Sequence, residues 1–78
     1  MTHSEALTAP YNGASLAKAL ARANEADHAY VLAVRRAGYW SRWDMPPRAH
    51  HALPEYIAKV AADRQLGLAI DAEKERQK

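Results

Sequence analysis

The chain has 78 residues, a net charge of +2, no cysteine and no phenylalanine, and alanine makes up much of its apolar fraction of 49%. These properties exclude disulfides and thiolate metal sites, and no stretch approaches the roughly 20 apolar residues of a membrane span. Because residues 1–5 also lack the basic and apolar regions of a signal peptide, we expect a cytoplasmic protein with no membrane partner.

The N-terminal segment 1–14 shows no periodicity and contains Pro10, Asn12 and Gly13, so we expect a mobile arm. Ser15 is a good N-cap, and the strong helix formers after it predict a helix that runs to about Ala37. The expected buried stripe of this helix has helical spacing and comprises Leu16, Leu20, Ala23, Val31 and Val34, with Tyr30 at its edge.

The middle of the chain contains a clear helix stop. Gly38 ends the first helix, or the helix continues through residues 39–43; Pro46 and Pro47 exclude any further continuation. A connector follows, and Pro54 suits the first turn of a second helix. The apolar stripe of this second helix comprises Ile57, Val60, Ala61 and Leu68. Residues 71–78 alternate in charge and predict a solvated C-terminal tail.

These elements predict an all-α fold, with residues 15–70 forming a single antiparallel helical hairpin. Large core residues are scarce and apolar side chains occur on both faces of each helix, so we expect a homodimer that resembles a small bundle. The alternative is an α+β fold, helix–β-hairpin–helix, with strands at 30–34 and 39–43 around a turn at Gly38.

The patterns associated with metal binding or catalysis are weak. Glu25 and His28 have Glu-x-x-His spacing, but they lie off the apolar stripe and no second such motif completes a ligand set. His50 and His51 are adjacent and read as a solvated connector pair. No serine lies in a nucleophile elbow, and there is no phosphate-binding glycine loop. We expect no enzymatic activity, no cofactor and no metal.

Two charges fall within the apolar stripes of the predicted helices. Asp27 lies in the first and Arg64 in the second. A buried charge is costly unless it is paired, and antiparallel helices would bring these two residues within about one turn of each other. We therefore predict a structural ion pair between them.

The strongest candidate for a contact surface lies between the helices. Both tryptophans fall within four residues of each other, and the segment 35–51 contains four arginines against the single acid Asp44. Tryptophan, tyrosine and arginine are the residues most enriched at binding hot spots. The predicted partner-binding residues are Arg35, Arg36, Tyr39, Trp40, Arg42, Trp43 and Arg48. The competing interpretation is that both tryptophans belong to the core at the end of the bundle.

We expect a non-enzymatic interaction module that binds a surface of a larger protein, as an inhibitor, adaptor or accessory subunit. Chains of this size and composition are common among phage and mobile-element regulators. The alternative is a small nucleic-acid-binding transcriptional regulator, because aromatic rings stack on unpaired bases and arginines bind phosphates.

Overall fold

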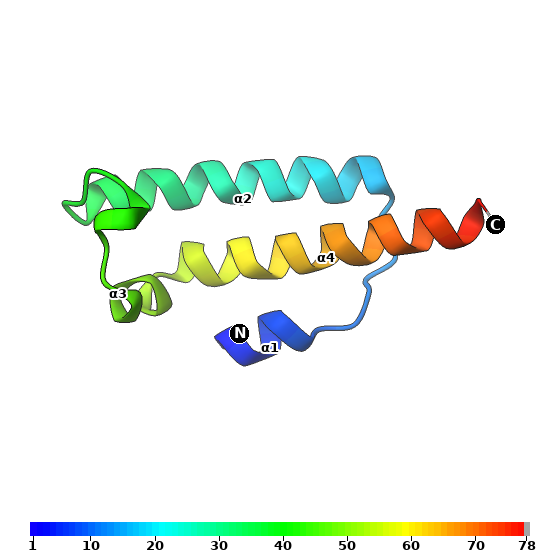
Figure 1. Cartoon of the computed structure of the whole chain (residues 1–78), viewed down its shortest axis with the longest axis horizontal. Coiled ribbons are helices and arrows are strands. Elements are labelled where there is room, and N and C mark those ends of the chain that lie inside the picture. The colour runs from blue at the N-terminus through cyan, green and yellow to red at the C-terminus, as the bar shows by residue number, and fades with distance from the viewer. Residues whose placement is uncertain (78) are drawn as a thin grey trace.

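The computed structural model describes residues 1–77 and consists of four α-helices and one short 3-10 helix (Figure 1). Their bounds are α1 His3–Thr8, α2 Leu16–Arg36, η1 Arg42–Asp44, α3 Pro47–Ala52 and α4 Pro54–Arg76. The predicted all-α class is confirmed. The described part of the chain has no strand, so the alternative with a β-hairpin is wrong.

The two long helices lie side by side and run in opposite directions (Figure 1). The short helix α1 packs on α4, on the side away from α2, so α4 is the middle element of the molecule. η1 and α3 lie together at one end, where the chain passes from α2 to α4. The result is an elongated particle of 46 × 21 × 17 Å.

Helix α2 begins and ends at the residues that the sequence indicates. The hydroxyl of Ser15 accepts a hydrogen bond from the Lys18 amide at 3.3 Å. At the other end, Gly38 adopts a φ of +97°, and its amide donates to the Arg35 carbonyl at 3.0 Å. The Tyr39 amide reaches back to the Val34 carbonyl at 3.2 Å, which completes a Schellman motif. Gly38 therefore ends α2, and residues 39–43 do not pair as a strand with residues 30–34, which are helical.

The buried face of α2 differs from the predicted stripe. The buried residues are Ala19, Ala23, Tyr30, Ala33 and Val34. Ala23 and Val34 were predicted to be buried, but Leu16, Leu20 and Val31 are exposed. Helix α4 packs on the alanine-rich side of α2, where the small side chains let the two helix backbones approach closely.

The N-terminal segment differs from the arm that we expected. Thr2 and Glu5 form a reciprocal capping box at the start of α1. After α1, Arg64 Nε donates to the Ala9 carbonyl at 3.0 Å. The Gln65 amide group donates to the Pro10 carbonyl and accepts from the Asn12 amide, each at 2.9 Å. Polar side chains of α4 therefore bind the segment after α1. Such contacts leave no periodic apolar pattern in the sequence, so residues 1–14 gave no sign of them.

The C-terminal segment is mostly exposed, as expected for a solvated tail, but it is helical. Helix α4 continues through this segment to Arg76, and the last residue of the predicted tail, Lys78, lies outside the described residues. Gly67 lies inside this helix and does not cap it. Ion pairing between Glu73 and Arg76, at 3.7 Å, accompanies the extra turns.

The main cluster of large buried side chains lies at the end of the molecule that carries η1 and α3. Tyr30, Val34 and Met45 form its centre. The half-buried residues packed around them are Tyr39, Ala49, Leu53 and Tyr56. This cluster supports the segment that carries both tryptophans.

Candidate functional site

The loop after α2 presents Trp40 and Trp43 to solvent. The Schellman motif directs Tyr39 back onto the Tyr30–Val34–Met45 cluster, and Trp40 is 83% exposed. The next turn is η1, in which the Ser41 amide and hydroxyl both donate to Asp44 Oδ2, at 3.1 and 3.2 Å. Trp43 projects from this turn and is 84% exposed. Met45 then returns to the core, so the tryptophans lie on a short loop that is anchored at both ends.

His50 joins this loop to the helices. Its Nε2 lies 3.0 Å from the carbonyl oxygen of Arg42 and its Nδ1 bonds the Tyr30 hydroxyl. A carbonyl only accepts, so Nε2 must carry a hydrogen, and in the neutral ring Nδ1 then accepts from the tyrosine. Tyr30 is only 2% exposed, and this burial raises the pKa of its phenol above the ordinary value. His50, which we expected to be solvated, is therefore half-buried and connects the Arg42 carbonyl to the Tyr30 hydroxyl.

The neighbouring aromatic rings extend this bridge to all four helices. His51 stacks on His3 of α1 with ring centroids 4.5 Å apart, and Tyr56 of α4 lies 5.6 Å from His51. Tyr56 also contacts the rings of Tyr30 and His50, each at 5.6 Å. The sequence does not predict this cluster, because adjacent histidines point in different directions and the partner rings of each come from other helices.

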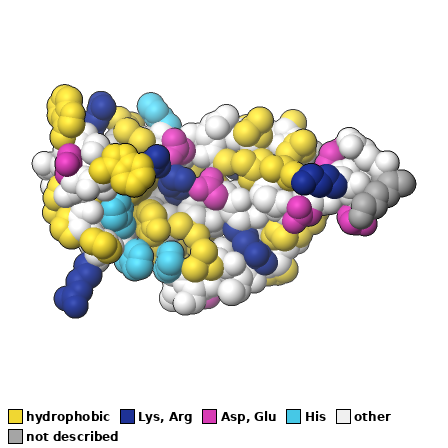
Figure 2. Space-filling model, in the orientation of Figure 1, with side chains coloured by type: hydrophobic (Ala, Val, Ile, Leu, Met, Phe, Trp, Pro, Cys, Tyr) yellow, Lys and Arg dark blue, Asp and Glu magenta, His cyan; other side chains and the backbone are white. Residues whose placement is uncertain are grey.

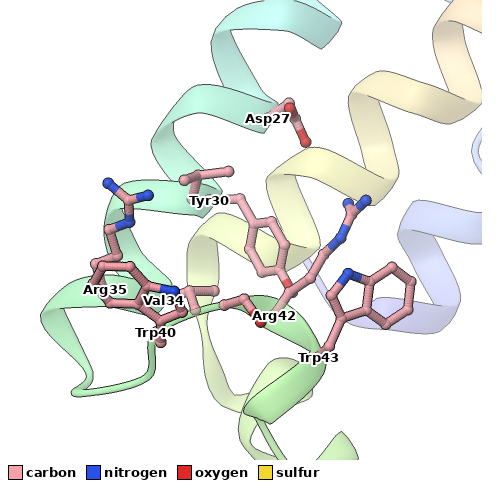
Figure 3. A pocket seen from close by; sticks show the side chains of 9 residues that line it. Asp27, Tyr30, Val34, Arg35, Trp40, Arg42 and Trp43 are labelled. Atoms are coloured by element: carbon pink, nitrogen blue, oxygen red, sulfur yellow. The ribbon is translucent and has the colours of Figure 1, made fainter.

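Trp40 and Trp43 are each paired with an arginine. The Arg35 guanidinium carbon lies 5.9 Å from the Trp40 ring centroid, and that of Arg42 lies 5.1 Å from the Trp43 ring centroid. A guanidinium over an indole face is a cation–π arrangement. Figure 3 shows one pair on each side of a hollow, with Tyr30 between them.

We call this hollow the Trp–Arg hollow. It encloses about 270 Å³. Its lining residues are Asp27, Tyr30, Val31, Val34, Arg35, Trp40, Ser41, Arg42 and Trp43. Tyr30 and Val34, each 2% exposed, form an apolar base, and Asp27 lies at its edge (Figure 3). The hollow thus combines an apolar base with two stacked cations.

The predicted contact residues fall into two groups. Arg35, Trp40, Arg42 and Trp43 line the hollow. Tyr39 lies behind them, half-buried against the core. Arg36 and Arg48 are exposed but do not line it; Arg36 borders a separate depression with Leu53 and Glu55. Four of the seven predicted residues therefore line one hollow, and only the fold separates Arg35 and Arg42 from Arg36 and Arg48.

The predicted ion pair between Asp27 and Arg64 is not formed within the chain. Asp27 pairs with Lys59 Nζ at 3.7 Å, while Arg64 binds the Ala9 carbonyl. Lys59 precedes Arg64 by five residues, or about 7.5 Å along α4 at 1.5 Å per residue. The actual register of the two helices therefore places a different cation opposite Asp27, whose side chain is half exposed.

Comparison of the chain with protein-family models, curated proteins and solved structures finds no match. Within residues 1–77 no helix is long and apolar enough to cross a membrane. The described residues also contain no cluster of three or more histidine or carboxylate side chains placed to hold a metal ion. The Trp–Arg hollow is therefore the candidate site on its geometry alone.

Proposed function

We propose that the chain is a non-enzymatic interaction module, an inhibitor, adaptor or accessory subunit, that binds a larger protein through the surface around Trp40 and Trp43. The observation that carries this proposal is the exposure of both indoles, 83% and 84%, beside a hollow with an apolar base. Tryptophans are highly buried on average, so two that are almost fully exposed on one anchored loop are unusual for a monomer. Hot spots also concentrate in tryptophan and arginine.

The rigidity of the loop supports the same proposal. The Gly38 turn, the Ser41–Asp44 cap and the His50 bridge hold the loop from three sides. A surface that is ordered before binding loses less conformational entropy when the partner arrives.

The test is affinity capture from an extract of the native host, with nuclease treatment. We expect the double variant Trp40→Ala/Trp43→Ala to lose the captured partner while its circular dichroism spectrum is unchanged. Leu32→Ala is the matched control, because Leu32 is also a large exposed side chain, at 44%, but lies outside the hollow. Equal capture by the double variant would contradict the proposal.

Binding of single-stranded nucleic acid is the second candidate. Both stacked Trp–Arg pairs favour it, since indoles stack on unpaired bases and guanidiniums bind phosphates. A nucleic-acid complex would weaken steeply with salt, as bound counterions are released. A protein complex anchored by the tryptophans, with fewer charge contacts, would weaken less steeply with salt.

We also propose that a second copy of the chain covers the leucine patch, which we define as Leu16, Leu20 and Ile70. All three are exposed, and Leu16 and Ile70 each lie eleven residues beyond the Asp27–Lys59 pair, so they stand at the same level of the antiparallel helices. Figure 2 shows hydrophobic side chains at both ends of one face, with charged side chains between. The leucine patch lies away from the tryptophans, so such a dimer leaves both hollows free.

The amount of exposed surface supports this dimer. The chain exposes 5530 Å². A compact monomer of its mass, 8.7 kDa, would expose about 4,700 Å². The excess of roughly 800 Å² is what one partner buries in a standard interface. A cysteine-free chain also suits a reducing compartment, and we therefore propose a cytoplasmic location.

A further inference from the structure

The guanidiniums of Arg35 and Arg42 are held in place but unpaired. Each lies over an indole ring, at 5.9 and 5.1 Å from the ring centroid, and within residues 1–77 neither guanidinium makes a hydrogen bond or an ion pair. Stacking uses the face of a guanidinium and leaves the N–H donors along its edge free. Two sets of oriented donors therefore border the Trp–Arg hollow, and such donors match the oxygens of a carboxylate.

The net charge around the hollow favours an anion. The one carboxylate in its lining, Asp27, already has Lys59 at 3.7 Å. Cationic ligands such as trimethylammonium groups bind to open aromatic faces, but here Arg35 and Arg42 already cover one face of each indole. The hollow is therefore not a cage for a cation.

The base of the hollow favours an apolar side chain. About 270 Å³ corresponds to roughly nine waters at about 30 Å³ each, slightly below the range of small-molecule sites. The base is formed by Tyr30 and Val34, whose only polar atom, the Tyr30 hydroxyl, is already bonded to His50. Water against this base gains few hydrogen bonds, so an apolar side chain displaces it favourably.

The surroundings favour a peptide over a nucleic-acid strand. A strand repeats its negative charge at every nucleotide and follows a continuous basic groove. On the α4 side of the hollow, Lys59 contacts both Asp27 and Asp63, at 3.7 and 2.6 Å, and these two carboxylates offset its charge. Arg36 and Arg48 are not part of the lining and do not extend a basic track.

We propose that the Trp–Arg hollow binds an acidic segment of the partner protein, with one large apolar side chain on Tyr30 and Val34 and flanking carboxylates on Arg35 and Arg42. This inference rests on the proposed function and specifies the chemistry of the partner. The partner segment presents a leucine-like or aromatic residue between acidic residues, in an extended or loop conformation that reaches into the hollow.

The experiment is a fluorescence titration, which reports on this site alone because Trp40 and Trp43 are the only tryptophans of the chain. The probe is a blocked peptide, Gly-Ser-Asp-Leu-Glu-Ser-Gly. Matched peptides replace the acids by Asn and Gln, or the leucine by alanine. A thymidine oligonucleotide of about ten residues is the nucleic-acid probe. We expect the acidic leucine peptide to bind with a Kd between about 10 µM and 1 mM, and both matched peptides to bind about tenfold more weakly.

Variants of the arginines distinguish direct contact of the peptide with Arg35 and Arg42 from a general attraction to the positive charge of the protein. We expect Arg35→Gln and Arg42→Gln each to weaken peptide binding about tenfold. The controls Arg36→Gln and Arg48→Gln remove the same charge outside the hollow and should change the Kd less than about twofold, because salt screens distant charges. The Arg42 carbonyl that binds His50 is a backbone group, so Arg42→Gln retains the bridge.

Three results would overturn this inference. They are no response to the acidic peptide at about 1 mM, equal binding of the neutral peptide, or equal effects of all four arginine variants. Tighter binding of the oligonucleotide with the same dependence on Arg35 and Arg42 would replace the peptide by a nucleic acid. If these results coincide with loss of partner capture in the Trp40→Ala/Trp43→Ala variant, the proposed function stands and only the chemistry of the partner is wrong.

Discussion

Tyr30 and the two tryptophans differ in what they contribute to stability and to binding. Tyr30 is the largest fully buried residue, and it combines packing with a hydrogen bond to His50. Trp40 and Trp43 lie on the same end of the molecule but are almost fully exposed. The stability of the fold should therefore depend on the tyrosine, while the indoles remain available for a partner.

Truncating the tryptophans should leave the fold intact. We expect Trp43→Ala to lower the free energy of unfolding by less than about 1 kcal/mol, which is the typical size of an exposed cation–π contact. Tyr30→Ala should cost about 3–5 kcal/mol, as for other large buried aromatic residues. Urea unfolding monitored by circular dichroism measures both changes. Similar losses for the two variants would mean that Trp43 belongs to the core.

Alkaline pH should weaken the fold through Tyr30. Burial raises the pKa of its phenol, so the unfolded chain loses this proton at a lower pH than the folded chain. The resulting stabilisation is complete below about pH 10, and it is lost as the pH rises from there through the raised pKa. Tyr30→Phe should cost about 1 kcal/mol at neutral pH and should show a smaller alkaline loss. Melting temperatures of both proteins between pH 8 and pH 12 provide the comparison; parallel curves would refute the assignment.

The helices depend on local sequence at their ends and on polar contacts between them. Gly38 adopts a left-handed conformation that ends α2, whereas Gly67 lies inside α4. Arg64 and Gln65 of α4 hold the segment that follows α1. Neither the turn at Gly38 nor the hydrogen bonds from Arg64 and Gln65 require a large apolar side chain. This fits a chain that is rich in alanine.

Alanine at the two glycines should have opposite effects. A Cβ at either position meets no atom within 4 Å, so only the backbone conformation decides the result. Gly38→Ala forces an L-residue into the left-handed region and should cost about 1–2 kcal/mol. Gly67→Ala removes a flexible residue from a helix interior and should stabilise by about 0.5–1 kcal/mol. Chemical denaturation measures both, and changes of equal sign would contradict this account.

Asp27 and Arg64 should behave as independent residues. In a double-mutant cycle with Asp27→Ala and Arg64→Met, we expect the two losses to add within about 0.5 kcal/mol, since these residues share no partner. The matched cycle of Asp27→Ala with Lys59→Ala should show a coupling of about 0.2–1 kcal/mol, because the Asp27 carboxylate is half exposed to solvent. A large coupling between Asp27 and Arg64 would indicate that they pair across a dimer.

The molecule as a whole is more extended than its length requires. Its radius of gyration is 13.8 Å, against about 11.5 Å for a compact domain of this length. Within residues 1–77, five of the eight buried apolar residues are alanines. A fold with so little buried volume gains from covering the leucine patch.

Self-association should be measurable and confined to the leucine patch. We expect sedimentation equilibrium to show a dimer at micromolar concentrations, and Leu20→Arg to shift it to monomer because Leu20 is 48% exposed within the patch. Leu32→Arg is the control, since Leu32 lies on the opposite side of α2 from Ala23. A wild-type chain that remains a folded 8.7 kDa monomer at high concentration would exclude the dimer.

The sequence by itself determined the elements whose signals are local. Ser15 and Gly38 predict where α2 begins and ends, and Pro54 predicts where α4 begins, because capping and backbone restriction act over a few residues. The concentration of tryptophan and arginine in residues 35–48 likewise predicted where the candidate site lies.

Only the tertiary structure decided how these elements face one another. The register of α2 against α4 set Asp27 opposite Lys59, rather than Arg64, and buried alanines where leucines were expected. It also brought His50 between Tyr30 and Arg42, and divided the arginines between the hollow and the open surface. These outcomes depend on contacts between residues far apart in the chain, and the pattern within one helix does not specify the rotation of the next.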